Sequence, residues 1–378
     1  MPRCPFEAEP VVRWGVSVRN RVGVVPVTAL PPSHPLNSDT SASWLVSAYR
    51  GLRPPVTPVW FMRQAGRSLP EYRALRVGTH MLDACLDPEL AAEITLQPVR
   101  RHGVDAAIFF SDIVVPLKLA GVPVRIESGV GPVFDAPVDT PEAVHALVGE
   151  HPPQGLDEAL APITEAVQRT VAGLRMLQTA RTPLIGFAGA PFTLAAYLVA
   201  GRPSKDHLAA RAMIHRHPQA WAALLEWCAD VSGRFLRAQV LAGASAVQLF
   251  DSWAGSLPAA TYSAAVAPAS RTTFDAVRDL VDETGVRVPL VHFAVGAGEL
   301  HGVLDLDVDC VGVDWRTPID EAAARIGGPS VQGNLDPALL GAPWPVLRAG
   351  VDEVLRRGRA ASGHVFNLGH GVPPDTDP

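Results

Sequence analysis

The sequence is poor in lysine and cysteine. Two of its 32 basic residues are lysines, Lys118 and Lys205, and the other 30 are arginines, so Schiff-base chemistry has two candidate residues. The four cysteines lie far apart and form no Cys-x-x-Cys pair. This argues against a disulfide framework or a cysteine zinc cluster and fits a reducing cytoplasm. The net charge of −6 argues against a broad nucleic-acid surface, so an anionic ligand needs a local cluster of positive charge.

An uninterrupted apolar run is also missing. Residues 182–201 carry no charge, but Gly186, Gly189 and Pro191 divide them into a strand, a turn and a helix start. We therefore expect no membrane span there. The N-terminus shows no secretory signal pattern. A hydrophobic content of 48% excludes disorder as the main state.

Proline is abundant, and its distribution suggests a boundary in the chain. Seven of the 36 prolines lie within the first 40 residues, where no hydrophobic periodicity is sustained. Such a segment is typical of a solvated tail. We predict a disordered leader over residues 1–40 and one catalytic domain over residues 41–378.

From about residue 45, short β-rich runs alternate with longer amphipathic stretches, which is the pattern of parallel βα units. Eight strands are predicted, at 58–62, 106–110, 184–187, 246–250, 289–293, 310–314, 330–332 and 364–368. Helices are predicted at 88–102, 209–217, 219–242, 264–284 and 318–326. This order predicts an α/β fold, a single (β/α)8 TIM-type barrel. An open doubly wound sheet is the alternative, but the dinucleotide fingerprint after its first strand is absent.

Catalytic residues of such barrels lie at the carboxyl ends of the strands. Arg63 and Arg67, four residues apart, follow the first predicted strand, and arginine binds carboxylate or phosphate through two hydrogen bonds. A solvated loop with an internal salt bridge to Glu71 is the alternative. Asp112 follows the second strand, where a carboxylate is either a helix cap or a functional group. His370 stands between two glycines, which favours a tight backbone near a ligand.

For the other candidates, sequence position alone gives weaker support for a functional role. Asp251 and Asp314 also end predicted strands, and Tyr197 lies on an apolar helix start, a position more typical of a core residue. No zinc-protease, Walker A or kinase pattern is present. We predict no metal site.

Six motifs together resemble one known family. The run Met62-Arg-Gln-Ala-Gly-Arg67 is the most specific of them. The motifs occupy residues 58–73, 110–113, 186–197, 248–253, 332–337 and 366–371. Over about residues 45–378 the chain resembles the uroporphyrinogen decarboxylases of haem biosynthesis. The resemblance implies a (β/α)8 barrel without metal or organic cofactor, usually a homodimer. It also implies the reaction: four acetate side chains of uroporphyrinogen become methyl groups, giving coproporphyrinogen and CO2.

The resemblance also implies the site and the partner. The substrate-binding residues would be Arg63, Gln64, Ala65, Gly66, Arg67, Asp112, Tyr197, Ser252 and His370. Among them Asp112 would be the central catalytic group, assisted by Arg63 and Tyr197. The partner is a small tetrapyrrole, with no nucleic acid and no membrane.

The implied chemistry agrees with these residue types. A pyrrole protonated on a ring carbon becomes an iminium-like cation that accepts the electrons of the departing carboxylate, so the substrate supplies its own electron sink. Ionised Asp112 is suited to stabilise that cation, and the arginines are suited to bind carboxylates. The general acid stays open between Arg63, water and His370, although a guanidinium is a poor proton donor at pH 7.

The chain departs from the family pattern at three places. Ser68 replaces an aromatic residue, the proline-rich leader is longer than usual, and the last helix of the family is missing. We expect apolar surface to be exposed beside the eighth strand as a result. Two alternative functions are a zinc- or corrinoid-linked methyltransferase of the same superfamily and a non-catalytic tetrapyrrole-binding protein.

Overall fold

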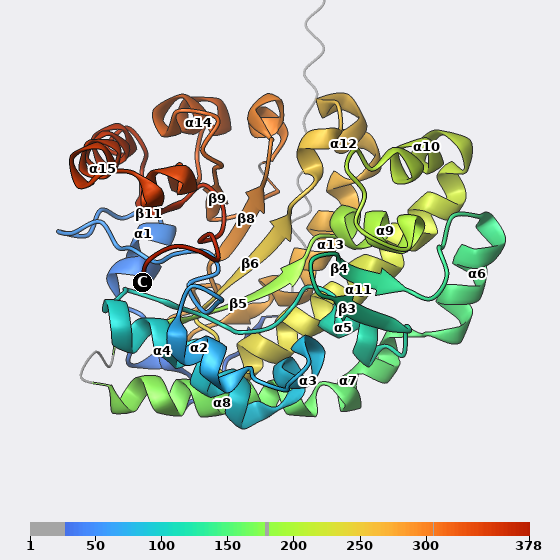
Figure 1. Ribbon diagram of the computed structural model, residues 1–378, viewed down its shortest axis with the longest axis horizontal. Helices are drawn as coiled ribbons and strands as arrows, with labels where there is room; N and C mark the ends of the chain where they lie inside the picture. Colours follow the sequence, from blue (N-terminus) through green and yellow to red (C-terminus); the bar gives the residue numbers. More distant parts are fainter. Residues whose placement is uncertain (1–26, 178–180, 305) are drawn as a thin grey trace, which may run out of the picture.

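A computed structural model of the chain describes residues 27–177, 181–304 and 306–378. At its centre lies a curled parallel sheet of seven strands in the order β11-β10-β9-β8-β6-β5-β2 (Figure 1). The strands are β2 (Ala107–Ile108), β5 (Leu184–Gly189), β6 (Ala246–Asp251), β8 (Leu290–Ala294), β9 (Cys310–Gly312), β10 (Ser330–Leu335) and β11 (His364–Leu368). Seven of the eight predicted strands are therefore confirmed, and the fold is α/β with a parallel sheet.

The remaining predicted strand, residues 58–62, is not a regular strand. Val59 forms an isolated parallel bridge to Phe366 of β11. On its other side the Val59 carbonyl accepts a hydrogen bond from the backbone of Asp105, just before β2, at 2.8 Å. The Val59 N–H is bound by the Asp105 carboxylate at 2.8 Å, and Pro58 has no N–H to donate. These local features interrupt a backbone ladder on this segment.

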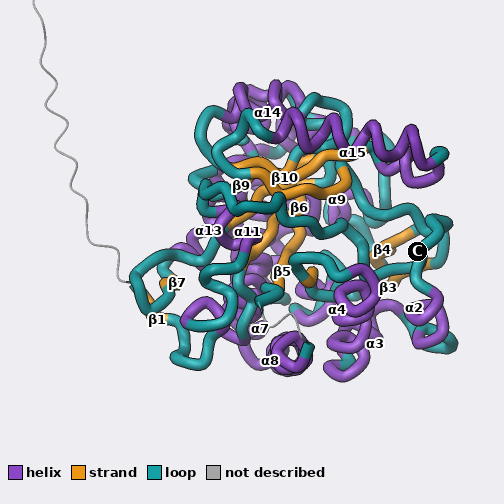
Figure 2. Tube along the Cα trace, turned by 90° about the vertical axis from the view of Figure 1, so that its left-hand side faces the viewer, coloured by secondary structure: helices purple, strands orange, loops and turns teal. Residues whose placement is uncertain are grey.

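Helices surround the sheet, as the tube view shows (Figure 2). They are α1 (Trp44–Tyr49), α2 (Pro70–Leu75), α3 (Met81–Leu86), α4 (Pro88–His102), α5 (Val115–Leu119), α6 (Pro141–Glu150), α7 (Leu156–Ala159), α8 (Ala161–Met176), α9 (Pro191–Ala200), α10 (Leu208–Arg216), α11 (Pro218–Ala242), α12 (Ala259–Ala265), α13 (Ala267–Arg278), α14 (Ile319–Ile326) and α15 (Trp344–Gly358). A small antiparallel hairpin, β3 (Val124–Glu127) and β4 (Gly131–Phe134), precedes α6.

The predicted helix over residues 264–284 is wrong in its bounds. Pro268 lacks the N–H that a continuing helix would need, so α12 ends at Ala265 and α13 begins anew at Ala267. After Arg278 the chain turns into β7 (Leu280–Val281), which pairs in parallel with β1 (Thr28–Ala29).

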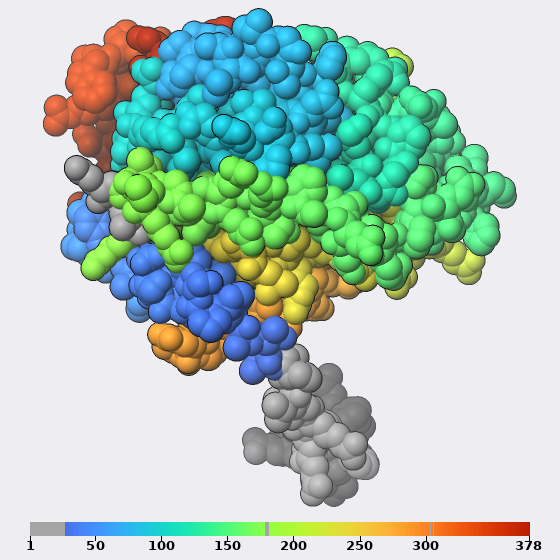
Figure 3. Space-filling model, turned by 90° about the horizontal axis from the view of Figure 1, so that it is seen from below, coloured from blue at the N-terminus to red at the C-terminus, as the bar shows by residue number. Residues whose placement is uncertain are grey.

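The N-terminal part of the described chain corrects the predicted leader boundary. The predicted leader includes residues 28–40, but these residues pack on the domain through the β1–β7 pair and a buried Leu36. Arg175 of α8 binds Asp39 at 2.8 Å and the Ser33 carbonyl at 2.9 Å. From below, Figure 3 shows this segment lying beside α8. The folded region therefore begins before residue 41, and residues 1–26 of the expected leader lie outside the described residues.

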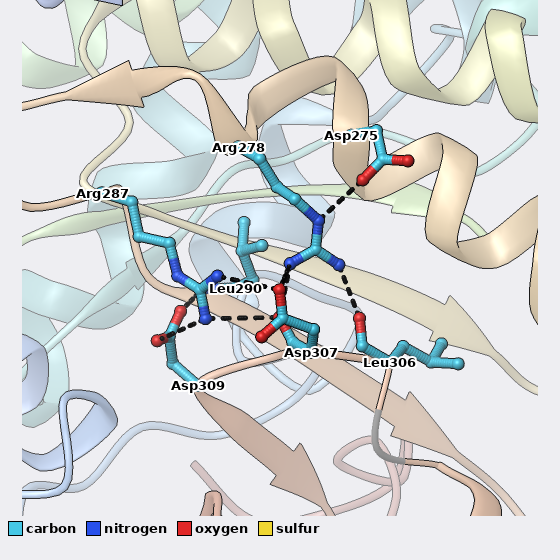
Figure 4. Close-up of polar contacts among 7 residues, drawn as sticks. All are labelled: Asp275, Arg278, Arg287, Leu290, Leu306, Asp307 and Asp309. Carbon is cyan, nitrogen blue, oxygen red and sulfur yellow. Dashed lines mark hydrogen bonds and ion pairs between the residues drawn. The ribbon is translucent and has the colours of Figure 1, made fainter. Parts of the chain in front are cut away.

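An ion-pair network fastens α13 to the segment before β9 (Figure 4). The Arg278 guanidinium donates to the Asp275 carboxylate at 2.8 Å, to the Asp307 carboxylate at 2.5 Å and to the Leu306 carbonyl at 2.5 Å. Arg287 extends the network to Asp307 and to Asp309. Because Arg278 is only 18% exposed, its hydrogen bonds are partly shielded from water.

An apolar groove of about 370 Å³ lies beside β11, where exposed apolar surface was predicted. Trp344, at the start of α15, is 68% exposed at its rim. The other lining residues are Thr57, Val59, Phe61, Leu335, Leu340, Leu347, Val351, Leu355 and Phe366. Within the described ranges, no helix is both long and apolar enough to span a bilayer.

Candidate active site

The predicted site residues come from separate segments that end at the carboxyl edge of the sheet. Residues 63–67 follow the Val59 segment, Asp112 follows β2, Tyr197 lies on α9 after β5, Ser252 follows β6, and His370 follows β11. Carboxyl ends of parallel strands share one edge, so these segments converge. The charge of Arg63 contributes to the pKa values of Asp112, Tyr197 and His370, so these three side chains lie within electrostatic range of one guanidinium.

Arg63 is exposed and lies across the backbone of the last loop. Its φ is 61°, in the left-handed region, and its side chain passes directly over Gly371. A Cβ atom at position 371 would overlap the Arg63 side chain, so the glycine makes room for the guanidinium stem. Gly66 serves the same loop, because a Cβ there would lie 2.7 Å from the Arg63 carbonyl.

In the rest of this loop, residues 64–67, Gln64 and Ala65 pack against the domain, whereas Arg67 points its charge to the surface. Buried Gln64 donates to the Ala106 carbonyl at 3.0 Å and accepts from the Phe61 N–H at 2.9 Å, so its side chain braces the loop. Ala65 is partly buried against the core. Arg67 is exposed, and in the described part of the chain neither it nor Arg63 forms an ion pair.

The expected alternative for this loop, a salt bridge to Glu71, is wrong. Glu71 instead pairs with Arg101 of α4 at 2.7 Å. The two loop arginines therefore keep their charge available for an anionic ligand.

Asp112 combines a structural contact with an available oxygen. Its Oδ1 accepts the Val114 N–H at 3.0 Å, a short turn that leads into α5. Its Oδ2 accepts no hydrogen bond from any described residue. Burial raises the pKa of Asp112, and the Val114 hydrogen bond and the Arg63 charge offset part of that increase. The carboxylate is thus fixed in place and incompletely solvated, and it can accept further donors.

Tyr197 is held by an aromatic stack that no local sequence pattern indicated. Its ring lies 4.1 Å from the Trp253 ring, and the other neighbour of Trp253 is His207, stacked at 4.1 Å. Burial and the Asp112 charge raise the pKa of Tyr197 to about 12, so the phenol keeps its proton at neutral pH. Tyr197 is therefore partly buried beside Asp112, whereas its sequence position alone suggested a core residue. Ser252, next to Trp253, is also partly buried.

His370 follows β11 in the last loop of the site. Burial lowers the pKa of His370, and the charges of Arg63 and Arg316 lower it further, while Asp314 acts in the other direction. The imidazole is therefore mostly neutral at pH 7. Its ring contacts the edge of Trp315, with a centroid distance of 6.0 Å.

Asp251 belongs to a buried network below the site. It is fully buried and accepts hydrogen bonds from Thr193 of α9 and Tyr262 of α12, both at 3.1 Å. His292 Nε2 lies 3.7 Å from its carboxylate. Asp251 thus joins helices to the end of β6 and presents no free oxygen to a ligand.

The described residues contain no group of three or more His, Cys, Asp or Glu side chains placed to hold a metal ion. The site offers two arginines without an ion pair among the described residues, a carboxylate with one oxygen that accepts no hydrogen bond from them, a protonated phenol and a neutral imidazole. This set is suited to a ligand that carries both carboxylates and N–H donors.

These features define an α/β protein whose candidate site, at the carboxyl edge of a parallel sheet, is suited to a carboxylated ligand. The chain belongs to the uroporphyrinogen decarboxylase (URO-D) family, whose pattern matches residues 40–378.

Curated relatives match over nearly their whole length. The uroporphyrinogen decarboxylase of Leifsonia xyli subsp. xyli is 61% identical over 365 residues, covering 93% of this chain and 96% of that protein. The protein of the same name from Arthrobacter sp. is 61% identical over 345 residues, covering 91% and 95%. Among solved structures, a methyltransferase from Methanosarcina mazei has a TM-score of 0.68 at 18% identity, covering 89% of this chain and 94% of that one. This last likeness concerns the fold alone.

Proposed function

We propose that this protein is a uroporphyrinogen decarboxylase. It removes the four acetate carboxylates of uroporphyrinogen as CO2 and leaves methyl groups, giving coproporphyrinogen. The observation that carries the proposal is Asp112, a fixed carboxylate with one unoccupied oxygen beside Arg63 and Tyr197. Family membership and relatives of that name at 61% identity support it.

The reaction needs no electron acceptor beyond the substrate. A proton adds to the pyrrole carbon next to the one that bears the acetate, and the ring becomes an iminium-type cation. The bond between the acetate methylene and its carboxylate then breaks, and its electron pair neutralises the ring as CO2 leaves. A proton adds to the exocyclic methylene to form the methyl group, and the first proton departs. In total, each decarboxylation consumes one proton and converts one acetate into a methyl group and CO2.

The site residues divide this work. Arg63 and Arg67 bind substrate carboxylates through charge-assisted hydrogen bonds. Asp112 accepts pyrrole N–H groups and stabilises the cation electrostatically. Tyr197, whose phenol is protonated at neutral pH, donates a hydrogen bond to the substrate. Because the pKa of His370 is lowered, its neutral imidazole fits hydrogen bonding to the substrate better than proton donation.

We also propose that the Val59 segment acts as the eighth strand and closes the sheet into a (β/α)8 barrel. Its hydrogen bonds to β11 on one side and to the residue before β2 on the other support this closure. A single catalytic domain, a homodimer and a cytoplasmic location complete the proposal, on the basis of the family resemblance and the cysteine content.

The decisive test is anaerobic incubation with uroporphyrinogen, followed by oxidation and chromatography of the porphyrins by carboxylate number. We expect products with seven down to four carboxylates and full activity after exhaustive chelation. Binding of the porphyrinogen without loss of carboxylates would instead favour the non-catalytic binding protein. Stoichiometric zinc with activity lost on its removal would favour the methyltransferase.

A further inference from the structure

Two arginine side chains flank the loop that carries His370. On one side the stem of Arg63 passes over Gly371. On the other side the Trp315 backbone fits against Gly369, where a Cβ atom would overlap it. The Arg316 guanidinium carbon lies 3.9 Å from the centroid of the Trp315 ring. Residues 369–371 therefore lie between Arg63 and the stacked Trp315–Arg316 pair. These two segments follow strands β11 and β9, which are labelled in Figure 1.

Among the described residues, the Arg316 guanidinium donates hydrogen bonds through one of its nitrogens. Its Nη1 donates to Asp314 Oδ2 at 2.5 Å, and its side chain remains 51% exposed. Asp314 is 2% exposed and also accepts the Gly296 N–H at 2.6 Å, so this carboxylate is itself fixed. Among the described residues, Nε and Nη2 of Arg316 find no acceptor. Stacking and the ion pair thus preorganise a guanidinium that retains free donors.

The position of Arg316 separates it from the reacting centre. His370 experiences the charges of both arginines, whereas Asp112 and Tyr197 experience that of Arg63. The contacts agree with this division, because Arg63 packs on Gly371 and the Trp315–Arg316 pair packs on Gly369, with His370 between the two glycines. If the pyrrole that carries the reacting acetate is seated at Asp112, the side chains that face Arg316 are ones that do not react in that step.

We propose that Arg316 binds a carboxylate of the tetrapyrrole that does not react, a propionate, and so contributes to affinity rather than to the chemical step. This inference rests on the proposed function. Propionates persist through all four decarboxylations, whereas acetates disappear one by one. Arg316 should consequently contribute equally to binding of the first substrate and of the later intermediates.

The test compares Arg316→Gln with wild type on uroporphyrinogen and on the pentacarboxylate intermediate, with KM and kcat measured separately. One lost charge-assisted hydrogen bond corresponds to about a tenfold change in affinity. We expect KM to rise about tenfold for both substrates, with kcat within about twofold of wild type. Arg348→Gln, which removes a 69%-exposed arginine of α15, is the matched control and should leave both constants unchanged.

Arg316→Gln also leaves buried Asp314 without its cation, which could impair folding. The double variant Asp314→Asn/Arg316→Gln removes both charges and keeps an acceptor for the Gly296 N–H, so it should fold and show the same KM increase. An unchanged KM for both substrates overturns the inference. A KM increase confined to uroporphyrinogen also overturns it, because Arg316 would then contact an acetate. Wild-type protein without turnover would instead overturn the proposed function.

Discussion

Replacing Asp112 with Asn separates a charge role from a structural one. The side chain keeps its size, and the amide oxygen can still accept the Val114 N–H that the Oδ1 atom now accepts at 3.0 Å. The turn into α5 should therefore persist, since Asn supports such turns as well as Asp does. The variant loses the negative charge and offers an N–H group where the unoccupied oxygen was.

The expected loss of turnover follows from this geometry. Asp112 Oδ2 has no donor among the described residues, so its charge is available to a cationic ring. Removing one well-placed electrostatic stabiliser lowers the rate by ~10²–10³, or about 2.7–4 kcal/mol. We expect Asp112→Asn to lose that much turnover and still bind the porphyrinogen. Asp112→Glu keeps the charge one methylene away and should retain more activity than Asp112→Asn.

The assay is the anaerobic decarboxylation described above, with binding followed separately by fluorescence quenching. If Asp112 serves only the turn into α5, the order of the variants reverses. Asp112→Asn would then be nearly silent and Asp112→Glu the more damaged. Turnover of Asp112→Asn within a few-fold of wild type would refute the catalytic role.

Thermal stability provides an independent test with a defined sign. Burial raises the pKa of Asp112 in the folded protein, so its protonated form is favoured by folding. Its contribution to stability is complete below the unfolded pKa of about 3.9 and is lost as pH rises through the folded pKa. Asp112→Asn avoids this loss, so the variant should melt above wild type at pH 7. The difference should shrink toward pH 4, and a lower melting temperature for the variant at pH 7 would contradict this account.

Three further predictions concern other parts of the molecule. Arg278→Ala should lower the free energy of unfolding by about 2 kcal/mol, measured by urea denaturation, because it removes charge-assisted bonds to two carboxylates and two carbonyls; a change below ~0.5 kcal/mol would contradict it. Trp344→Gln should change stability by less than ~0.5 kcal/mol while reducing binding of a hydrophobic dye, since the ring is 68% exposed. Arg63→Gln should raise the pKa of His370, measured by NMR titration, because it removes one of two nearby cations; an unchanged value would mean that Arg63 lies elsewhere in solution.

Elements whose signals are local could be predicted from the sequence. The predicted helix 88–102 has the bounds of α4 because both of its ends are specified nearby. Asp87 accepts the N–H groups of Glu89 and Leu90, and Gly103 ends the helix with a φ of 60°. Strand β11 likewise matches the predicted range 364–368, since its apolar run is bounded by glycines.

Features that depend on distant segments could not be predicted. Leu280 and Val281 continue an apolar periodicity that reads as helix, and their pairing partners lie about 250 residues earlier, at Thr28 and Ala29. The sequence predicts Tyr197 to be a core residue on an apolar helix, because nothing near it in sequence indicates the Trp253 ring. For the site, motif resemblance supplied residue identities that periodicity alone left open.

The surroundings of Asp112 explain how one carboxylate can favour a transient cation over the neutral substrate. In the free protein its charged form is disfavoured by burial, which is why its pKa is raised. A neutral pyrrole ring compensates this cost only through N–H hydrogen bonds. A protonated ring adds a full positive charge at the same distance, in a poorly solvated place where the attraction is weakly screened. The gain is therefore larger for the cation than for the substrate, and that difference is what lowers the barrier.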